Sequence, residues 1–152
     1  MSIAVRTAVI TDVDAIMSVE KTGISHPWTR DSIESLINDD NKVALVACDG
    51  EEVVGYVYAS YVLDEAEIGN ICLLPDRRGE GMGRMLMDAM AKFLLAKGVT
   101  KIFLEVEEGN TPALKLYGKC GFVMYNRRKD YYGEGRDALL YSAALNASSG
   151  QI

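Results

Sequence analysis

The sequence contains a turn with three glycines at alternate positions, Gly79, Gly81 and Gly83, between an apolar run that ends at Leu74 and an amphipathic stretch. A glycine turn at the start of a helix leaves backbone N–H groups unpaired and lets the backbone approach a ligand. The positive end of the helix dipole lies behind these groups. Such a turn suits an anion, and we interpret it as a cradle for a pyrophosphate.

Two reactive side chains follow the turn. Glu105 lies within the apolar run of residues 100–106, where a lone carboxylate is unusual unless it faces a cavity or an ionic partner. Tyr117 comes seven residues after Asn110, two turns into the next predicted helix, and we expect it to face the same crevice. The alternatives to a chemical role are an ion pair across the sheet for Glu105 and plain core packing for Tyr117.

The glycine turn does not match the two commonest nucleotide-binding motifs. A P-loop requires a lysine and then serine or threonine after its last glycine, but Arg84 and Met85 follow Gly83. A dinucleotide-binding turn requires GxGxxG, and no third glycine follows Gly81 and Gly83 at that spacing. A turn that serves only chain geometry is the remaining alternative.

Hydrophobic periodicity and turn signals predict the element order β-α-α-β-β-β-α-β-α-β-β. The fold class is therefore α+β, with a mixed, mostly antiparallel seven-stranded sheet flanked by four helices. A helix separates the third and fourth strands of the central run, so these two should be parallel, with a crevice at their carboxyl ends. We expect strands at residues 3–7, 43–48, 53–63, 67–74, 100–106, 122–126 and 137–144.

Composition limits the possible partners and location. We expect residues 1–145 of the 152-residue chain to form one domain, followed by a flexible tail at 146–152. The net charge of −6 argues against sequence-independent binding of nucleic acid and suits a basic peptide or amine. The sequence shows no signal peptide, no apolar run long enough for a membrane span, and no metal-ligand spacing among its three cysteines. These features indicate a cytoplasmic protein without membrane or metal association.

Several stretches resemble one enzyme family. The segment RGEGMG at residues 78–83 resembles the Arg/Gln-x-x-Gly-x-Gly/Ala signature of the GCN5-related N-acetyltransferases (GNAT), and the predicted element order matches the GNAT fold across nearly the whole chain. The segments VLDEAEIGNICLLPD, LEVEEGNTPALKLYGKCGF and RRKDYYGEGRDALLY resemble the RimI type, whose members acetylate the N-terminal alanine of a small-subunit ribosomal protein. The resemblance implies acetyl-CoA as cosubstrate and a protein N-terminus, that of a ribosomal protein, as acceptor.

The resemblance also implies a cofactor site. Backbone N–H groups of the glycine turn would hold the pyrophosphate of coenzyme A, and the strand before the turn would pair with the pantetheine arm like an added strand. One N–H of that strand could act as oxyanion donor, a contact that can be worth ~3 kcal/mol. The thiol of Cys72 would be incidental, and the Glu80 carboxylate would have to point away from the phosphates. The implied cofactor residues are Ile71, Cys72, Leu73, Gly79, Glu80, Gly81, Met82, Gly83, Arg84 and Asn110.

For catalysis, the resemblance implies Glu105 as general base, acting directly or through one water, and Tyr117 as the acid that protonates the leaving thiolate. Acetyl transfer would then be direct, without an acyl-enzyme. Two alternatives remain for the activity: acetylation of a lysine or small amine, and a regulatory module that binds acetyl-CoA without turnover.

The acceptor groove is the least specific part of the resemblance. Tyr131 and Tyr132 would close over the first residues of the peptide, with packing against a neighbouring strand as the alternative. Trp28 and Glu65 would contribute to the remaining wall. An acidic wall would suit a basic residue in the acceptor.

Overall fold

The computed structural model describes residues 3–23 and 29–145, and the seven strands in this part form one sheet in the order β1-β2-β3-β4-β5-β7-β6. All neighbouring strands are antiparallel except β4 and β5, which are parallel. The predicted element order and mixed sheet are confirmed. The strands are β1 (Ile3–Thr7), β2 (Lys42–Asp49), β3 (Glu52–Val62), β4 (Glu65–Leu73), β5 (Lys101–Glu107), β6 (Val123–Gly133) and β7 (Arg136–Ala144), and the α-helices are α1 (Val13–Gly23), α2 (Arg30–Asn38), α3 (Met82–Ala96) and α4 (Thr111–Lys119).

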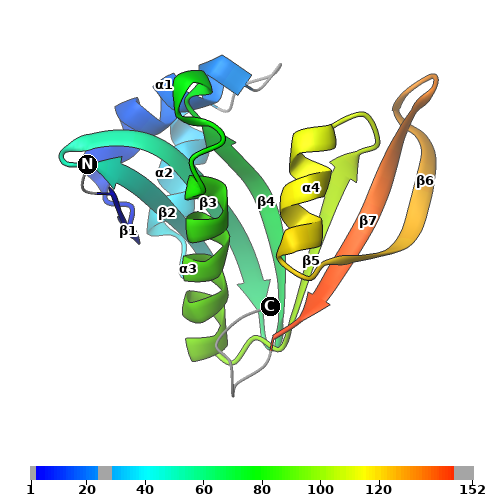
Figure 1. Cartoon of the computed structure of the whole chain (residues 1–152). Helices are drawn as coiled ribbons and strands as arrows, with labels where there is room; N and C mark the ends of the chain where they lie inside the picture. Colours follow the sequence, from blue (N-terminus) through cyan, green and yellow to red (C-terminus); the bar gives the residue numbers. More distant parts are fainter. Residues whose placement is uncertain (1–2, 24–28, 146–152) are drawn as a thin grey trace.

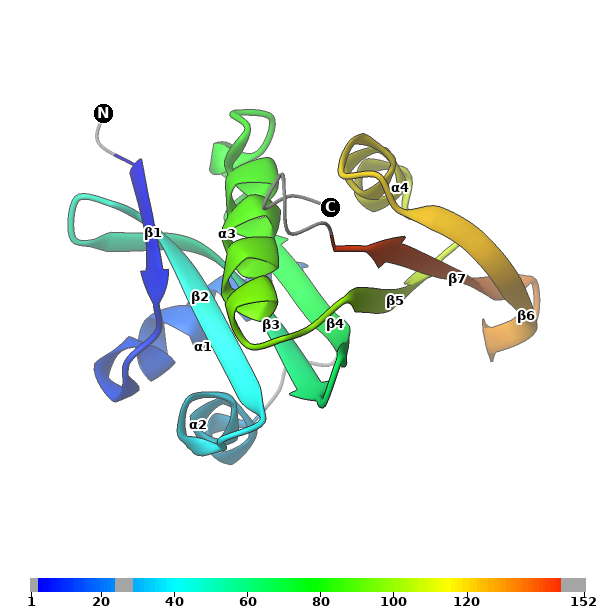
Figure 2. The same ribbon diagram turned by 90° about the horizontal axis from the view of Figure 1, so that it is seen from below.

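The helices cover the sheet on both faces and create two hydrophobic cores (Figures 1 and 2). Helices α1 and α2 bury Ile16 and Ile33 against one face of β2 and β3, while α3 and α4 bury Leu86 and Tyr117 against the other face. The apolar side chains of α3 recur at helical spacing, which explains why the residues after the glycine turn form a buried helix. No helix in the described residues is long and apolar enough to cross a membrane.

The parallel contact between β4 and β5 is short. It runs only from the pair Glu65–Lys101 to the pair Glu67–Phe103. Beyond that point β4 stays paired with β3, β5 stays paired with β7, and the two strands diverge (Figure 1). The sheet is therefore split at the carboxyl ends of its central strands, and the inner edge of β4 loses its partner.

A β-bulge lies in β4 just after the last pair with β5. Tyr58 pairs with Asn70 and Ala59 pairs with Ile68, so Gly69 is the extra residue. A Cβ at Gly69 would lie 1.9 Å from Cε2 of Tyr58, so only glycine fits under the tyrosine ring. The bulge shifts the side-chain alternation, because Ile68 faces the α3 core while Cys72 faces the α1 core.

The last hairpin differs from the sequence-based expectation. The strand predicted to end at residue 126 continues to Gly133, so Tyr131 and Tyr132 lie within β6 rather than in a turn. Its register with β7 shifts after Arg128, and the Asp130 N–H donates to the carboxylate of Asp137 (2.9 Å) instead of to the ladder. A side-chain acceptor thus replaces a backbone partner, which hydrophobic periodicity does not reveal.

The bulge yields a stability prediction. Gly69→Ala should lower the free energy of unfolding by about 1–3 kcal/mol, because the added methyl overlaps the buried ring of Tyr58. Gly109→Ala is the matched control, since a Cβ there meets nothing within 4 Å. Urea unfolding followed by circular dichroism measures both variants. Equal stability of the two would contradict the steric role of Gly69.

Candidate active site

The glycine turn has the backbone conformation that its sequence suggests. Gly79 has φ +79° and Gly81, the N-cap of α3, has φ +84°, and both values are in the left-handed region that favours glycine. Gly83 has a different reason: a Cβ there would lie 3.2 Å from Cδ2 of Leu116, so this glycine permits close packing of α3 and α4. The turn therefore presents the N-terminus of a fifteen-residue helix without side chains in front of it.

A pocket of about 510 Å³ lies where the glycine turn, the end of β4 and the start of α4 meet. All the predicted cofactor residues line it except Glu80 and Met82. These two residues could contact a cofactor only through their backbone N–H groups. Met82 is buried in the α3 core, and the Glu80 carboxylate lies 3.5 Å from Arg77 Nε. The pocket is lined by Asn70, Ile71, Cys72, Leu73, Arg78, Gly79, Gly81, Gly83, Arg84, Asn110, Pro112, Ala113, Lys115, Leu116 and Lys119.

The inner edge of β4 offers backbone groups to this pocket that no neighbouring strand pairs with. The Leu74 N–H donates to the Val54 carbonyl in β3 (2.9 Å), and N–H directions alternate along a strand. The N–H groups of Ile71 and Leu73 therefore point away from β3, toward the opening that β5 leaves. An extended ligand can pair with this edge as an added strand would.

Cations that the sequence analysis did not select surround the pocket. Arg78, Lys115 and Lys119 line it together with Arg84. The guanidinium of Arg78 donates through Nε to the Leu73 carbonyl (3.3 Å), and Arg84 donates through Nη1 to the Lys119 carbonyl (2.8 Å). In the sequence, Lys115 and Lys119 are four residues apart and so share one face of a helix. This spacing indicates a binding site for an anion only once α4 is known to lie beside the glycine turn.

The thiol of Cys72 is not suited to carry an acyl group. Burial raises its pKa, and its Sγ donates to the Val19 carbonyl (3.5 Å). A protonated, buried thiol is a weak nucleophile, since the thiolate is the reactive form. The pocket is therefore suited to direct transfer chemistry rather than to a cysteine intermediate.

Glu105 lies on β5 on the face opposite the α3 core. Its neighbours Leu104 and Val106 point into that core, so the alternation of the strand directs Glu105 to the other side. The predicted alternative, an ion pair across the sheet, is absent within residues 3–23 and 29–145. The arginines of this region are used by other carboxylates: Arg136 contacts Glu107 (2.8 Å). Glu105 is half-buried and available to a ligand.

Tyr117 has the position expected for core packing, and it is not among the residues that line the pocket. Its side chain is 6% exposed and packs edge-to-face on Phe122, with ring centroids 5.9 Å apart. Burial raises the pKa of Tyr117 to about 12, with smaller contributions from Cys120 and Tyr132. Burial, then the charge of Glu105, raises the pKa of Tyr132. Tyr132 therefore interacts electrostatically with both Tyr117 and Glu105.

The proposed acceptor wall is only partly brought together. Tyr131 and Tyr132 pack edge-to-face on each other with centroids 5.1 Å apart, and Arg128 lies over the exposed Tyr131 ring at 5.5 Å. Tyr132 interacts electrostatically with Tyr117 and Glu105, whereas Tyr131 is not among the groups that affect the pKa of Tyr117. Trp28 lies outside the described residues.

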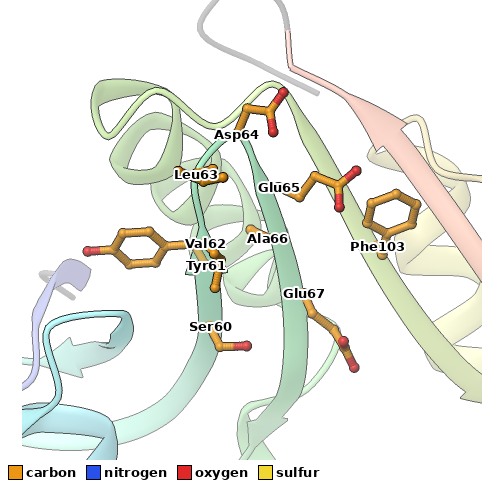
Figure 3. Close-up of a pocket in the computed structure, with 9 residues that line it drawn as sticks. All are labelled: Ser60, Tyr61, Val62, Leu63, Asp64, Glu65, Ala66, Glu67 and Phe103. Atoms are coloured by element: carbon orange, nitrogen blue, oxygen red, sulfur yellow. The ribbon is translucent and has the colours of Figure 1, made fainter.

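Glu65 lines a second cavity of about 340 Å³ between β3, β4 and β5. Figure 3 shows the carboxylates of Glu65 and Glu67 on β4 and the ring of Phe103 on β5 lying along this cavity. Phe103 and Glu105 occupy the same face of β5, roughly 7 Å apart along the strand. The carboxylate-lined cavity thus continues the face on which Glu105 lies.

The split sheet, the glycine turn and the strand edge without a partner belong to an α+β protein whose pocket is suited to an extended ligand that carries phosphates. Residues 12–122 match the acetyltransferase (GNAT) family. The chain therefore belongs to the GNAT family and is an N-acetyltransferase.

Individual relatives agree with this family. The [ribosomal protein bS18]-alanine N-acetyltransferase of Haemophilus influenzae is 33% identical over 123 residues, which are 80% of this chain and 82% of that protein. A Bacillus subtilis relative, provisionally named for the same activity, is 34% identical over 94% of this chain and 96% of its own. The crystal structure of the ribosomal-protein-S18-alanine N-acetyltransferase from Escherichia coli superimposes with a TM-score of 0.86 at 25% identity and covers 95% of each chain.

The burial of Tyr117 predicts its titration. An ultraviolet titration of the wild type minus that of Tyr117→Phe should show one tyrosine that ionises at about pH 12 rather than near the ordinary value of ~10. The titration is read only where circular dichroism shows that the fold is intact. Below pH 10 both states are protonated, so Tyr117 costs no stability there; above it, the unfolded state ionises first and the fold is weakened. A midpoint near 10 would contradict this.

Proposed function

We propose that the protein transfers the acetyl group of acetyl-CoA to the N-terminal α-amine of a protein, with the N-terminal alanine of a small-subunit ribosomal protein as the acceptor. The observation that carries the proposal is the half-buried Glu105, which is unpaired among the described residues and lies at the split of the sheet. A carboxylate there can accept a proton from an ammonium group that enters between β4 and β5. The names of the relatives from Haemophilus influenzae and Escherichia coli support the choice of acceptor.

The cofactor geometry supports acetyl-CoA. The backbone N–H groups of the turn from Gly79 to Arg84 and the surrounding cations suit its pyrophosphate. The unpaired edge at Ile71 and Leu73 suits the pantetheine arm, which carries amide donors and acceptors. Glu80 forms an ion pair with Arg77, so its negative charge is directed to a cation of its own chain.

The reaction is direct. Glu105 accepts a proton from the ammonium group, which has a pKa near ~8, and the free amine attacks the thioester carbonyl carbon. The N–C bond forms, the C–S bond breaks, and coenzyme A leaves as a thiolate. Tyr117 stays protonated at neutral pH because burial raises its pKa, and its hydroxyl can donate a proton to the sulfur as charge develops there. The attacking nitrogen releases its second proton as the amide forms, and this proton restores the Tyr117 hydroxyl, so the products are the acetylated amine and the free thiol of coenzyme A.

A peptide panel tests the proposal. Peptides with N-terminal alanine, serine or methionine, and an N-terminally blocked peptide with an internal lysine, are incubated with acetyl-CoA and analysed by mass spectrometry. Acetylation at the N-terminal amine of the alanine peptide is expected. Modification of the lysine alone would favour the lysine-acceptor alternative, and binding of acetyl-CoA without acetylation of any peptide would favour the regulatory module.

The catalytic roles predict the effects of two substitutions. Glu105→Gln and Tyr117→Phe should each lower kcat/KM by about 10²–10⁴-fold, because each removes a proton-transfer group. Glu107→Gln is the matched control on the same face of β5, and it should change kcat/KM little, since its carboxylate is used by Arg136. Steady-state kinetics with the alanine peptide measure the effect. Unchanged kcat/KM in both test variants would overturn the assigned roles.

The cradle makes a separate prediction. Gly81→Val should raise the KM for acetyl-CoA at least about tenfold, because a β-branched residue at φ +84° costs roughly 1–2 kcal/mol and displaces the N–H groups of the turn. Gly50→Val is matched in backbone strain, with φ +61° and nothing within 4 Å of the added Cβ, but Gly50 lies in the β2–β3 turn. Both variants should lose stability. An equal KM in the two would exclude the cradle as the pyrophosphate site.

A further inference from the structure

A carboxylate is buried beneath the candidate site. Asp12 and Glu20 are the buried charged residues in the described part of the chain. Asp12 is explained locally, since it accepts from Arg6 (2.7 Å) and from the Val9 N–H (2.8 Å). Glu20 lies on α1, is 1% exposed and accepts a hydrogen bond from the hydroxyl of Tyr56. Burial of a carboxylate is costly, so its position calls for a purpose.

Glu20 begins a chain of hydrogen bonds that ends at the β4 edge. The Tyr56 hydroxyl also accepts from Nδ2 of Asn70 (3.3 Å), and Oδ1 of Asn70 accepts from the N–H of Ile71 (3.1 Å). The path therefore runs from a helix on one face of the sheet, through a fully buried tyrosine on β3, to the backbone that lines the cofactor pocket.

The chain has one direction. Burial and the neighbouring Glu20 raise the pKa of Tyr56, so its hydroxyl keeps its single hydrogen and donates it to Glu20. The lone pair of that hydroxyl can then only accept from Asn70, which orients the amide nitrogen toward Tyr56 and the amide oxygen toward Ile71. The acceptor oxygen of Glu20 thus selects the amide orientation of Asn70 at a distance.

We infer that Glu20, Tyr56 and Asn70 are positioning residues that hold the Ile71 N–H in the direction required to donate a hydrogen bond to the thioester carbonyl oxygen as charge develops on it. This inference rests on the proposed function. The Ile71 N–H points to the edge of β4 that lacks a strand partner, two residues after Gly69 of the bulge. Its bond to Asn70 is local, so the N–H can be shared with an incoming oxygen in a three-centre arrangement. A donor whose direction is fixed before the reaction stabilises the transition state more than the bound thioester.

Substitution of Tyr56 tests the inference by separating kcat from KM. Tyr56→Phe should lower kcat about tenfold and leave the KM for acetyl-CoA within about twofold, because a misaligned oxyanion donor weakens transition-state binding. Ile16→Val, a cavity-forming change in the same α1 core, controls for lost stability and should leave kcat unchanged at temperatures where both variants are folded. A kcat for Tyr56→Phe that equals that of Ile16→Val would overturn the inference.

Substitutions at the two ends of the chain sharpen the test. Glu20→Gln keeps an acceptor for the Tyr56 hydroxyl and should retain kcat within about threefold, whereas Glu20→Met should resemble Tyr56→Phe. Asn70→Asp keeps the acceptor for Ile71 but loses the donor to Tyr56, so its effect on kcat should not add to that of Tyr56→Phe. Full additivity would contradict a connected chain. If Tyr56→Phe does not fold, the kcat of Asn70→Asp, a substitution at a half-buried position, tests the inference by itself.

Amide hydrogen exchange tests the same chain without any acceptor. Exchange of the Ile71 N–H, followed by NMR on the free protein, should be faster in Tyr56→Phe than in Ile16→Val by about tenfold. Unchanged protection of Ile71 overturns the inference whether or not the protein acetylates peptides. A wild type that is inactive on the peptide panel but shows this dependence on Tyr56 would instead overturn the proposed function.

Discussion

The separation of β4 from β5 is the constraint on which the rest of the structure depends. Each strand has a better partner elsewhere, since β4 pairs with β3 and β5 pairs with β7 along nearly all of their lengths. The three residue pairs that join the two halves of the sheet stop at Glu67 and Phe103. An unpaired strand edge inside a protein is costly unless something pairs with it. The split therefore creates both a space that suits an extended ligand and backbone groups that can form hydrogen bonds with one.

The split also separates charges of opposite sign in a protein that is acidic overall. The cations of the cofactor pocket come from the glycine turn and from α4, while Glu65, Glu67 and Glu105 lie on the face opposite the α3 core. An anionic cofactor and a cationic acceptor would thus be attracted to different sides of the same opening. The net charge of −6 alone could not indicate this arrangement, because it averages over the two sides.

Local signals in the sequence were sufficient for the fold and for the cradle. The alternation of the strands, the apolar stripe of α3 and the glycines at positive φ depend on neighbours in sequence, and the structure agrees with them. The lack of an ion pair for Glu105 among the described residues could not be predicted, because it depends on Arg136 and Arg127 of the last hairpin pairing with Glu107 and Glu108 at the end of β5. The true length of β6 depends on the side-chain acceptors of Asp130 and Asp137. The role of Lys115 and Lys119 depends on the packing of α4 beside the turn.

Glu20 is the clearest case of a residue whose sequence context misleads. An acidic residue on an amphipathic helix normally faces water, and the sequence alone gives no reason to place Glu20 in a core. Three unusual features nevertheless meet at residues 69–71. The bulge requires a glycine at position 69, and a buried carboxylate is linked to Asn70 through Tyr56. The Ile71 N–H donates to a side chain and not to a neighbouring strand. Each feature costs stability by itself. Their convergence on the backbone segment that faces the cofactor pocket is what a site under functional constraint, rather than a core under packing constraint, would produce.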